Sequence, residues 1–368
     1  MKKILYLFVC ILFFSASNAQ NYLAAVKVYY EWGYINEKGE WFIEPQFEGA
    51  KSFVEDISLV KVHGEWHYLN LNKDIISKNK PYKVKHHFSN GLARVIEKNR
   101  WGYVDKTGEY VIPPKFTKAL DFKNGLAPVM LKNDWGFINK KGEFVIGPKY
   151  SGAKEFVNNV GTIHDGRRWK FINKNKEVFP TDKEYEVLHY FSENLSPVRK
   201  KRKWGFADTT GKLAINPTYD ETTYFSEGLA AVKYAGKWGY MLPSGEWYVN
   251  PVFDFAKKFQ DGMGLVKDGK RYYYINKKNQ VIGKESPLKL RHYFSDGRAR
   301  VRENGLWGFV NKEAEVVIPF QYYAVKDFEN GLAAVKKDML WGFINPEGEL
   351  VIDFQFDDFE YFTKVNVH

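Results

Sequence analysis

The stretch WGFINKKGEFVIGPKY, residues 135–150, decides the fold because the chain repeats it. The preceding copy, residues 101–116, reads WGYVDKTGEYVIPPKF. Tryptophan recurs at steps of 34 or 35 residues, with Tyr272 in the one gap: Trp32, Trp66, Trp101, Trp135, Trp169, Trp204, Trp238, Trp307 and Trp341. Self-similarity at a period of this length indicates a repeat architecture.

A second marker, a phenylalanine that closes each unit, keeps the same period. These residues are Phe53, Phe88, Phe122, Phe156, Phe191, Phe225, Phe259, Phe294, Phe328 and Phe362. Ten units of about 34 residues therefore fill the chain and leave no room for a further domain. The expected organisation is a signal segment at residues 1–19 and one repeat domain over residues 20–368.

Each unit is predicted to be a three-stranded antiparallel meander. The segment Gly125–Val129 alternates as a strand does, and the run from Trp135 places its tryptophan and the aromatic two residues later on one strand face. All ten units have an aromatic at that second position. Asn139–Gly142 predicts a type I turn closed by a left-handed glycine. A third strand is expected to stop near Pro148, because proline cannot donate to a sheet ladder.

One such unit cannot be stable by itself. Its aromatic pair buries too little surface to offset the conformational entropy lost on ordering the unit. Neighbouring units must therefore cover one another, and the repeated tryptophans are predicted to belong to this structural core. Glycine beside tryptophan indicates that another backbone passes close to the strand.

These residues resemble the bacterial WG-repeat family, which is named for its Trp-Gly pair. The resemblance rests on recurrence of Trp-Gly-aromatic-apolar-Asn, then Gly, then Val-Ile-x-Pro-x-aromatic, and it covers almost all of the chain after residue 20. It implies an all-β repeat protein. It implies little about activity, because the family is defined by the repeat and not by a reaction.

Every third unit departs from the pattern, with a spacing of 103 residues. The units built on Trp66, Trp169 and Tyr272 lack the Pro-x-aromatic step. They replace the glycine after the aromatic by His67, Lys170 and Tyr273. These three substitutions are candidate binding residues, because the strand face should be less crowded there and could form a groove.

Two interpretations fit the longer period. In the first, a three-unit block was duplicated. In the second, three units form one turn of a superhelix, so that the environment of a repeat depends on its angular position. We expect the second: tandem meanders stacked into an open, all-β superhelix with about three units per turn. A closed propeller-like ring is the alternative, disfavoured because ten blades exceed the usual four to eight.

The same third units carry a histidine two residues before the closing phenylalanine: His86, His189 and His292. A shared metal would require the three imidazoles to converge within about 2 Å of one ion. An open superhelix would hold them a turn apart, so we expect binding or packing roles, no metal site and no cofactor.

The strongest charge run is a further candidate binding site for anions. It comprises Arg199, Lys200, Lys201, Arg202 and Lys203, where other units have a hairpin tip. The formal net charge of +11 also favours anionic partners without selecting among them. A solvated turn that keeps the protein soluble is the alternative explanation.

No catalytic motif is present in the sequence: there is no Gly-x-Ser-x-Gly, phosphate loop or His-Glu-x-x-His. We therefore expect a non-catalytic scaffold that binds a glycan, a cell-envelope component or a protein through an aromatic and basic surface. Two alternatives stay open. One is a glycan-active enzyme with carboxylates gathered from separate repeats, and the other is a purely structural envelope protein.

The N-terminal segment indicates export. Lys2 and Lys3 precede an apolar run over residues 4–14, and small residues at 17–19 suit a signal peptidase. We expect the mature chain in the periplasm, on the outer surface or outside the cell, with no transmembrane segment. We do not expect nucleic acid as a partner there. The one cysteine, Cys10, lies inside this segment, so disulfides are not expected.

Overall fold

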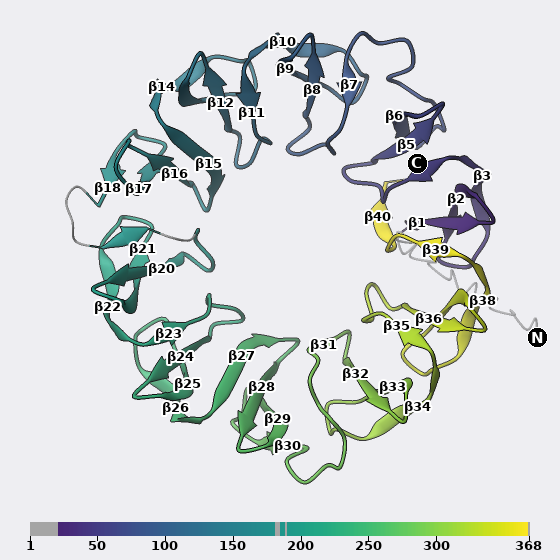
Figure 1. Cartoon of the computed structure of the whole chain (residues 1–368), viewed down its shortest axis with the longest axis vertical. Coiled ribbons are helices and arrows are strands. Elements are labelled where there is room, and N and C mark those ends of the chain that lie inside the picture. The colour runs from purple at the N-terminus through teal and green to yellow at the C-terminus, as the bar shows by residue number, and fades with distance from the viewer. Residues whose placement is uncertain (1–20, 181–184, 188–189, 367–368) are drawn as a thin grey trace, which may run out of the picture.

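The structure is a computed structural model that describes residues 21–180, 185–187 and 190–366. These residues form strands and turns, and no helix. Ten small antiparallel sheets follow one another around a closed ring, so the molecule is a ten-bladed β-propeller (Figure 1). The expected signal segment, residues 1–19, lies outside the described residues.

Blade 4 shows the organisation of a regular blade. Its strands are β11 (Lys118–Ala119), β12 (Ala127–Leu131), β13 (Asp134–Ile138) and β14 (Phe144–Tyr150), paired in that order. The first strand of a blade lies toward the ring centre and the last at the outer edge (Figure 1). The prediction of a three-stranded meander therefore missed one strand. A two-residue inner strand is too short to show a hydrophobic periodicity in the sequence.

The remaining strands are, by blade: blade 1, β1 (Asn21–Val28), β2 (Glu31–Asn36) and β3 (Trp41–Phe47); blade 2, β4 (Gly49–Ala50), β5 (Ile57–Val62) and β6 (Glu65–Asn70); blade 3, β7 (Lys83–Val84), β8 (Ala93–Glu97), β9 (Arg100–Val104) and β10 (Tyr110–Phe116); blade 5, β15 (Gly152–Val157), β16 (Val160–His164), β17 (Trp169–Asn173) and β18 (Val178–Phe179); blade 6, β19 (Glu186–Val187), β20 (Leu195–Lys200), β21 (Lys203–Asp208) and β22 (Leu213–Tyr219); blade 7, β23 (Glu221–Thr222), β24 (Ala230–Tyr234), β25 (Lys237–Met241) and β26 (Trp247–Phe253); blade 8, β27 (Phe255–Gln260), β28 (Met263–Asp268), β29 (Arg271–Asn276) and β30 (Val281–Ile282); blade 9, β31 (Phe294–Ser295), β32 (Arg298–Glu303), β33 (Leu306–Val310) and β34 (Val316–Tyr322); blade 10, β35 (Ala324–Val325), β36 (Ala333–Lys337), β37 (Leu340–Ile344) and β38 (Leu350–Phe356).

The C-terminal segment closes the ring. Strands β39 (Asp358–Phe359) and β40 (Thr363–Val365) both pair with β1, so blade 1 takes its inner strand from the far end of the chain. An ion pair of 2.5 Å between Lys51 and Glu360 spans the same junction. The expected open superhelix is therefore wrong and the ring alternative is correct. Closure removes the exposed sheet edge that an open stack would leave at its end.

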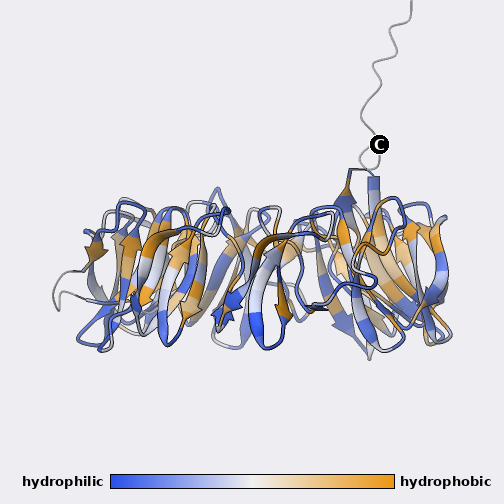
Figure 2. Ribbon diagram, turned by 90° about the horizontal axis from the view of Figure 1, so that it is seen from above, coloured by the Kyte–Doolittle hydropathy of each residue, from blue (hydrophilic) through white to orange (hydrophobic). Residues whose placement is uncertain are grey.

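The ring is a disc with two faces, which Figure 2 shows edge-on, with hydrophilic residues concentrated at the loops. We call the face that carries the turns between the second and third strands of each blade the hairpin face. Turn residues Lys132–Asn133 of blade 4 lie there. The opposite face, the turn face, carries the turns between the third and fourth strands. Asn139–Gly142 lies there and has the predicted geometry, with the amide of Gly142 donating to the carbonyl of Asn139 and a φ of +81° at the glycine.

Consecutive blades bury aromatic rings against one another, which confirms that the repeats cover each other. The aromatic two residues after each tryptophan position packs on the phenylalanine that closes its own sequence unit, which lies in the next blade; the centroids are between 4.7 and 5.2 Å apart. The ten pairs are Tyr34–Phe53, Tyr68–Phe88, Tyr103–Phe122, Phe137–Phe156, Phe171–Phe191, Phe206–Phe225, Tyr240–Phe259, Tyr274–Phe294, Phe309–Phe328 and Phe343–Phe362.

The repeated tryptophans lie at the margin of this core. Trp135 and Trp238 are buried, with 9% and 8% of their surface exposed, whereas the other seven are half-buried. Several carry a cation above the ring, such as Arg94 over Trp101 at 5.6 Å. The buried centre of each interface belongs to the second aromatic and the closing phenylalanine instead.

Glycine follows tryptophan because the outer strand bulges over it. In blade 4, Trp135 pairs with Tyr150 and Phe137 with Ile146, so two residues of β13 oppose four of β14. A Cβ on Gly136 would lie 2.6 Å from the carbonyl oxygen of Ile146. The third strand therefore continues through its proline. An outer strand tolerates proline because its free edge needs no amide donor.

Candidate functional site

Blades 2, 5 and 8 lack this bulge, which explains the departures at every third unit. The outer strand shrinks to β18 in blade 5 and β30 in blade 8, and in blade 2 it is reduced to an isolated bridge between Leu69 and Ile75. No outer backbone then crosses the position after the aromatic, so side chains larger than glycine fit. The three blades lie three, three and four blades apart around the ring. The three-unit period is therefore not a turn of a superhelix.

A groove opens on the hairpin face beside each of these blades. Groove A, between blades 2 and 3, encloses about 510 Å³; groove B, between blades 5 and 6, about 530 Å³; groove C, between blades 8 and 9, about 410 Å³. Each has the repeat aromatic in its wall and cations around it. The aromatics and cations are Trp66 with Lys78, Lys80, Lys83 and Lys85 in groove A; Trp169 with Arg167, Arg168, Arg199, Lys200 and Lys201 in groove B; and Tyr272 with Lys270, Arg271, Lys289 and Arg291 in groove C.

Two hairpins from adjacent blades supply the cations of groove B. The turn after β16 carries Arg167 and Arg168, and the turn after β20 carries Lys201. Three of the five residues of the predicted basic run thus line the groove: Arg199, Lys200 and Lys201. Arg202 stands exposed at the tip, and Lys203 forms an ion pair of 2.5 Å with Asp220.

Asp165 organises the arginine turn of groove B. Its Oδ1 accepts hydrogen bonds of 3.0 Å from the backbone amides of Arg167 and Arg168. Its Oδ2 lies 2.9 Å from the Nζ of Lys170, whose side chain is 14% exposed. Hydrogen bonds from Lys170 and from the two amides hold the pKa of Asp165 well below its usual range. The candidate Lys170 therefore positions the arginine turn and does not line the groove.

The carboxylate of Glu186 neutralises one cation of groove B. Its Oε2 accepts from both Nε and Nη2 of Arg199, at 3.0 and 2.8 Å. Within the described part of the chain, Arg167, Arg168, Lys200 and Lys201 form no ion pair. Four positive charges therefore face this groove without a bound carboxylate.

The indole of Trp169 forms the apolar wall of groove B. The ring of His164 meets it at 5.2 Å in an edge-on arrangement, and the Nζ of Lys154 lies 4.8 Å from its centroid. The hydroxyl of Ser151 lies 2.7 Å from Nδ1 of that histidine and fixes its orientation. Lys154 itself does not line the groove, so the indole and the cations of the two hairpins are the groups that converge there.

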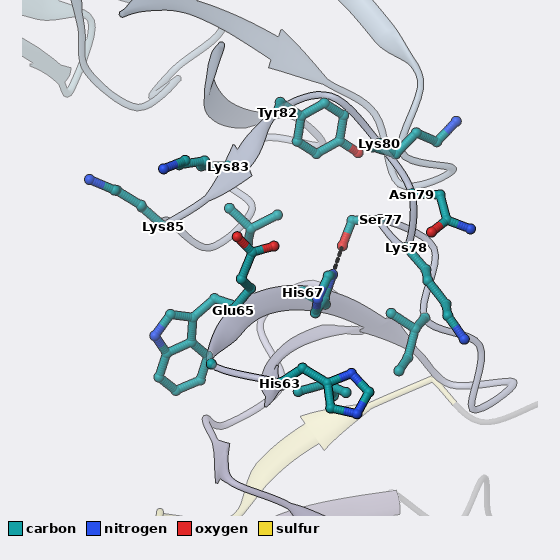
Figure 3. Close-up of a pocket in the computed structure, with 15 residues that line it drawn as sticks. His63, Glu65, His67, Ser77, Lys78, Asn79, Lys80, Tyr82, Lys83 and Lys85 are labelled. Atoms are coloured by element: carbon teal, nitrogen blue, oxygen red, sulfur yellow. Dashed lines mark hydrogen bonds between the residues drawn. The ribbon is translucent and has the colours of Figure 1, made fainter. Parts of the chain in front are cut away.

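Groove A repeats the design with lysines (Figure 3). Lys83 of β7 and Lys85, which follows this strand, enter on one side, and the segment that carries Lys78 and Lys80 forms the other side. His67 projects from β6 at the floor, where its Nδ1 lies 3.5 Å from Ser77 Oγ. The structure thus places this candidate in a groove, where it stands in the place of the usual glycine.

Groove C has tyrosine in place of tryptophan. The guanidinium carbon of Arg291 lies 5.4 Å from the centroid of Tyr272, and Arg271 forms an ion pair of 2.5 Å with Glu285. The candidate Tyr273 faces away from this groove. It is 3% exposed and packs against Phe253 of blade 7, with centroids 6.2 Å apart, so it belongs to the core.

The histidine column does not converge. His86 lies in blade 3, where its Nδ1 is 3.2 Å from a terminal nitrogen of Arg94, and His292 lies in blade 9 beside Trp307 at 5.4 Å. Burial first, and the neighbouring arginines second, lower the pKa of both imidazoles. His189 lies outside the described residues. Among the described residues, no three metal-ligating side chains gather at one point.

Apart from His67, sequence reasoning missed the cations of grooves A and C, and it missed the arginine pair of groove B. The sequence did contain a signal for these grooves. The unit beside each groove lacks the Pro-x-aromatic step and leads into a connection that is rich in Lys and Arg. In the described part of the chain, no helix has the length and apolar character needed to cross a membrane.

Comparison with solved structures gives matches at low identity. A chain described as a crystal structure of the eukaryotic initiation factor is 8% identical, covers 94% of this chain and 98% of its own, and has a TM-score of 0.48. Dihydro-heme d1 dehydrogenase NirN is 10% identical, with 92% and 74% covered and a TM-score of 0.36. PorZ of Porphyromonas gingivalis is 10% identical, with 93% and 58% covered and a TM-score of 0.27.

No curated protein matches the sequence. The profile of the WG containing repeat, in contrast, matches nine segments: residues 32–66, 101–134, 135–163, 171–204, 204–238, 238–272, 292–307, 307–338 and 341–364. These segments cover more than half of the chain and coincide with the Trp-Gly hairpins and the bulged outer strands described above. The chain therefore belongs to the family of WG containing repeat proteins.

Proposed function

We propose that this ring is a non-catalytic scaffold that binds acidic glycans in grooves A, B and C. The observation that carries the proposal is groove B, where four cations without an ion pair surround the indole of Trp169. The repetition of an aromatic wall and a cationic rim at three separate blades supports the same conclusion.

The chemistry of an acidic sugar matches both halves of the groove. The C–H face of a sugar ring packs on an aromatic plane, and Trp169 offers one. A carboxylate or sulfate on the same ring pairs with guanidinium groups, which bind planar anions through two donors at once. Arg167 and Arg168 supply such groups at the mouth of groove B.

Binding is favoured over hydrolysis by the number of carboxylates. Most glycosidases need two carboxyl groups on either side of the scissile bond. Among the described residues, one carboxylate lines each groove: Glu65, Glu186 and Glu285. The last two are engaged by Arg199 and Arg271. A purely structural role would need no repeated cationic groove at all.

The test is calorimetric titration with a short galacturonic acid oligomer and a neutral galactose oligomer of equal length. Replacing Arg167, Arg168, Lys200 and Lys201 by alanine should weaken binding of the acidic oligomer to groove B at least tenfold. A matched control replaces four exposed lysines of the turn face, Lys140, Lys141, Lys174 and Lys278, by alanine and should leave affinity unchanged.

Two outcomes would contradict the proposal. Equal affinity for acidic and neutral oligomers would show that the cations do not contribute to binding. Release of new reducing ends during incubation would establish catalysis in place of simple binding. Export directed by residues 1–19 would bring the grooves to the envelope, where acidic polysaccharides occur; secretion of a reporter fused to that segment tests this part.

A further inference from the structure

We infer that the ligand is a linear acidic polysaccharide that runs along an arc of the hairpin face from groove A through groove B to groove C. This inference rests on the proposed function and specifies its ligand as a polymer. It is argued from the position of the grooves, from the charges between them and from the sector without excess positive charge that completes the ring.

All three grooves open on the same face. Each one adjoins the turn between the second and third strands of its blade, at His63–Gly64, Asp165–Arg168 and Gly269–Lys270. Blades of a propeller are related by rotation about the ring axis, so equivalent turns lie on one face. Blades 2, 5 and 8 stand around one ring (Figure 1), so a single chain can reach the three grooves without passing around the edge of the disc.

The hairpins of blades 3 to 8 form a cationic arc. We count each turn between the second and third strands together with the residue pair that closes it. These six hairpins carry twelve Lys and Arg against four Asp and Glu. In blades 9, 10, 1 and 2 the same positions carry one lysine against four acidic residues. The excess of positive charge thus spans the arc from groove A to groove C and is absent from the rest of the circle.

Between the grooves, the arc presents cations that the fold does not use. Arg100 of blade 3, Lys132 of blade 4 and Arg202 of blade 6 are exposed at their hairpins. None of the three forms an ion pair within the described residues. Their positions fill the stretches of the arc that lie between groove A and groove B and just beyond groove B.

The hairpins of the sector that completes the ring carry exposed apolar side chains besides their acidic residues. Tyr29 and Tyr30 of blade 1 are 82% and 86% exposed, and Met339 of blade 10 is 74% exposed. A polyanion gains nothing electrostatically by crossing this sector. The arc therefore has two ends, and it matches a linear ligand of limited length and not a closed loop of charge.

Because the three grooves are fixed on one rigid ring, a polymer that has bound one groove binds the second and third grooves intramolecularly. Affinity for a polymer that spans two grooves can then exceed the affinity for a short oligomer by 10² or more without any new type of contact. The affinity stops increasing once the polysaccharide is long enough to reach both ends of the arc. Chain length should therefore control affinity up to a plateau.

The experiment titrates the full protein with galacturonic acid oligomers of increasing length. We expect short oligomers to bind three per protein, and long ones to bind one per protein with at least about a 100-fold lower Kd. Replacing Arg100, Lys132 and Arg202 by alanine should weaken the long oligomers about tenfold and leave the short ones unchanged. The turn-face variant of Lys140, Lys141 and Lys174 is the matched control.

The outcomes separate the two claims. If short oligomers bind three per protein and length has no effect, the arc is wrong and the proposed grooves stand. If neither short nor long oligomers bind, both fail. If single-stranded DNA of equal charge binds more tightly than the polysaccharide, the arc takes a polyanion of another class and the glycan assignment is overturned.

Discussion

The ring of Phe137 in blade 4 lies against the ring of Phe156 in blade 5, with centroids 5.0 Å apart and planes at 88°. Both side chains are fully buried, and the same pair recurs at every junction between blades. Each repeat is therefore completed by its neighbour, which is why no single unit could fold alone.

Removal of Phe156 should destabilise the whole ring. We expect Phe156→Ala to lower the free energy of unfolding by about 3–5 kcal/mol, because it leaves a cavity between two blades. Urea denaturation followed by tryptophan fluorescence measures the loss. Phe144→Ala, at a side chain that is 37% exposed, is the control and should cost much less. Equal losses for both variants would contradict the inter-blade role.

The glycine beside Trp135 offers a second test. Gly136→Ala places a Cβ 2.6 Å from the carbonyl oxygen of Ile146, so the bulge must move. We expect a loss of about 1–3 kcal/mol, as for other overpacked sites. Gly147→Ala on the same bulge meets nothing within 4 Å and should be close to neutral. Thermal denaturation compares the melting temperatures of the two variants. An unchanged value for Gly136→Ala would show that the bulge moves without a cost in stability.

The closure of the ring predicts the effect of truncation. A chain that ends at Asp357 lacks β39 and β40 and leaves the inner edge of β1 without its partner. We expect a lower melting temperature and concentration-dependent association, since an open edge pairs with other chains. Light scattering and calorimetry measure the two effects. A truncated chain that stays monomeric with an unchanged melting temperature would show that closure contributes nothing.

The histidines of blades 3 and 9 predict that acid weakens the fold. Burial lowers the pKa of His86 and His292 below the ordinary value of 6.5. The unfolded chain therefore binds protons before the folded chain does, so stability is full above pH 6.5 and falls as the pH drops toward the folded pKa.

The measurement is the melting temperature of the natural sequence at pH 7.5 and pH 5. Replacing both histidines by glutamine should reduce the difference between the two values. His63→Gln, at an exposed position, should leave it as it is. A double variant with the full acid sensitivity would assign the effect to other groups.

Lys170 should affect binding through Asp165. With Lys170→Met the carboxylate loses its 2.9 Å partner, and the turn that presents Arg167 and Arg168 loses support. We expect several-fold weaker binding of an acidic oligomer in groove B with little change in melting temperature. Asp165→Asn should lower the salt dependence of binding less than removal of the arginines does, because it alters their position and not their charge. Unchanged affinity in Lys170→Met would leave this lysine without a role in the site.

Much of the repeat could be predicted from residues close together in the chain. Alternation after Gly125, the turn at Asn139–Gly142 and the glycine beside Trp135 are local signals, and all three have the expected structure. The two-residue inner strands gave no such signal. Groove B was found in part through Arg199, Lys200 and Lys201, but Arg167 and Arg168 join them only because blades 5 and 6 are adjacent.

The sequence by itself determined that the chain is a series of β-repeats that bury aromatics against one another, because strand faces, turns and close backbone approach depend on neighbouring residues. The tertiary structure decided that ten blades close into a ring, since the small rotation between blades accumulates over the whole chain until β39 and β40 meet β1. The ring also placed the residues that depart from the repeat pattern on the same face of the disc. Trp66, Trp169 and Tyr272 became the walls of three grooves because rotation about one axis placed them there.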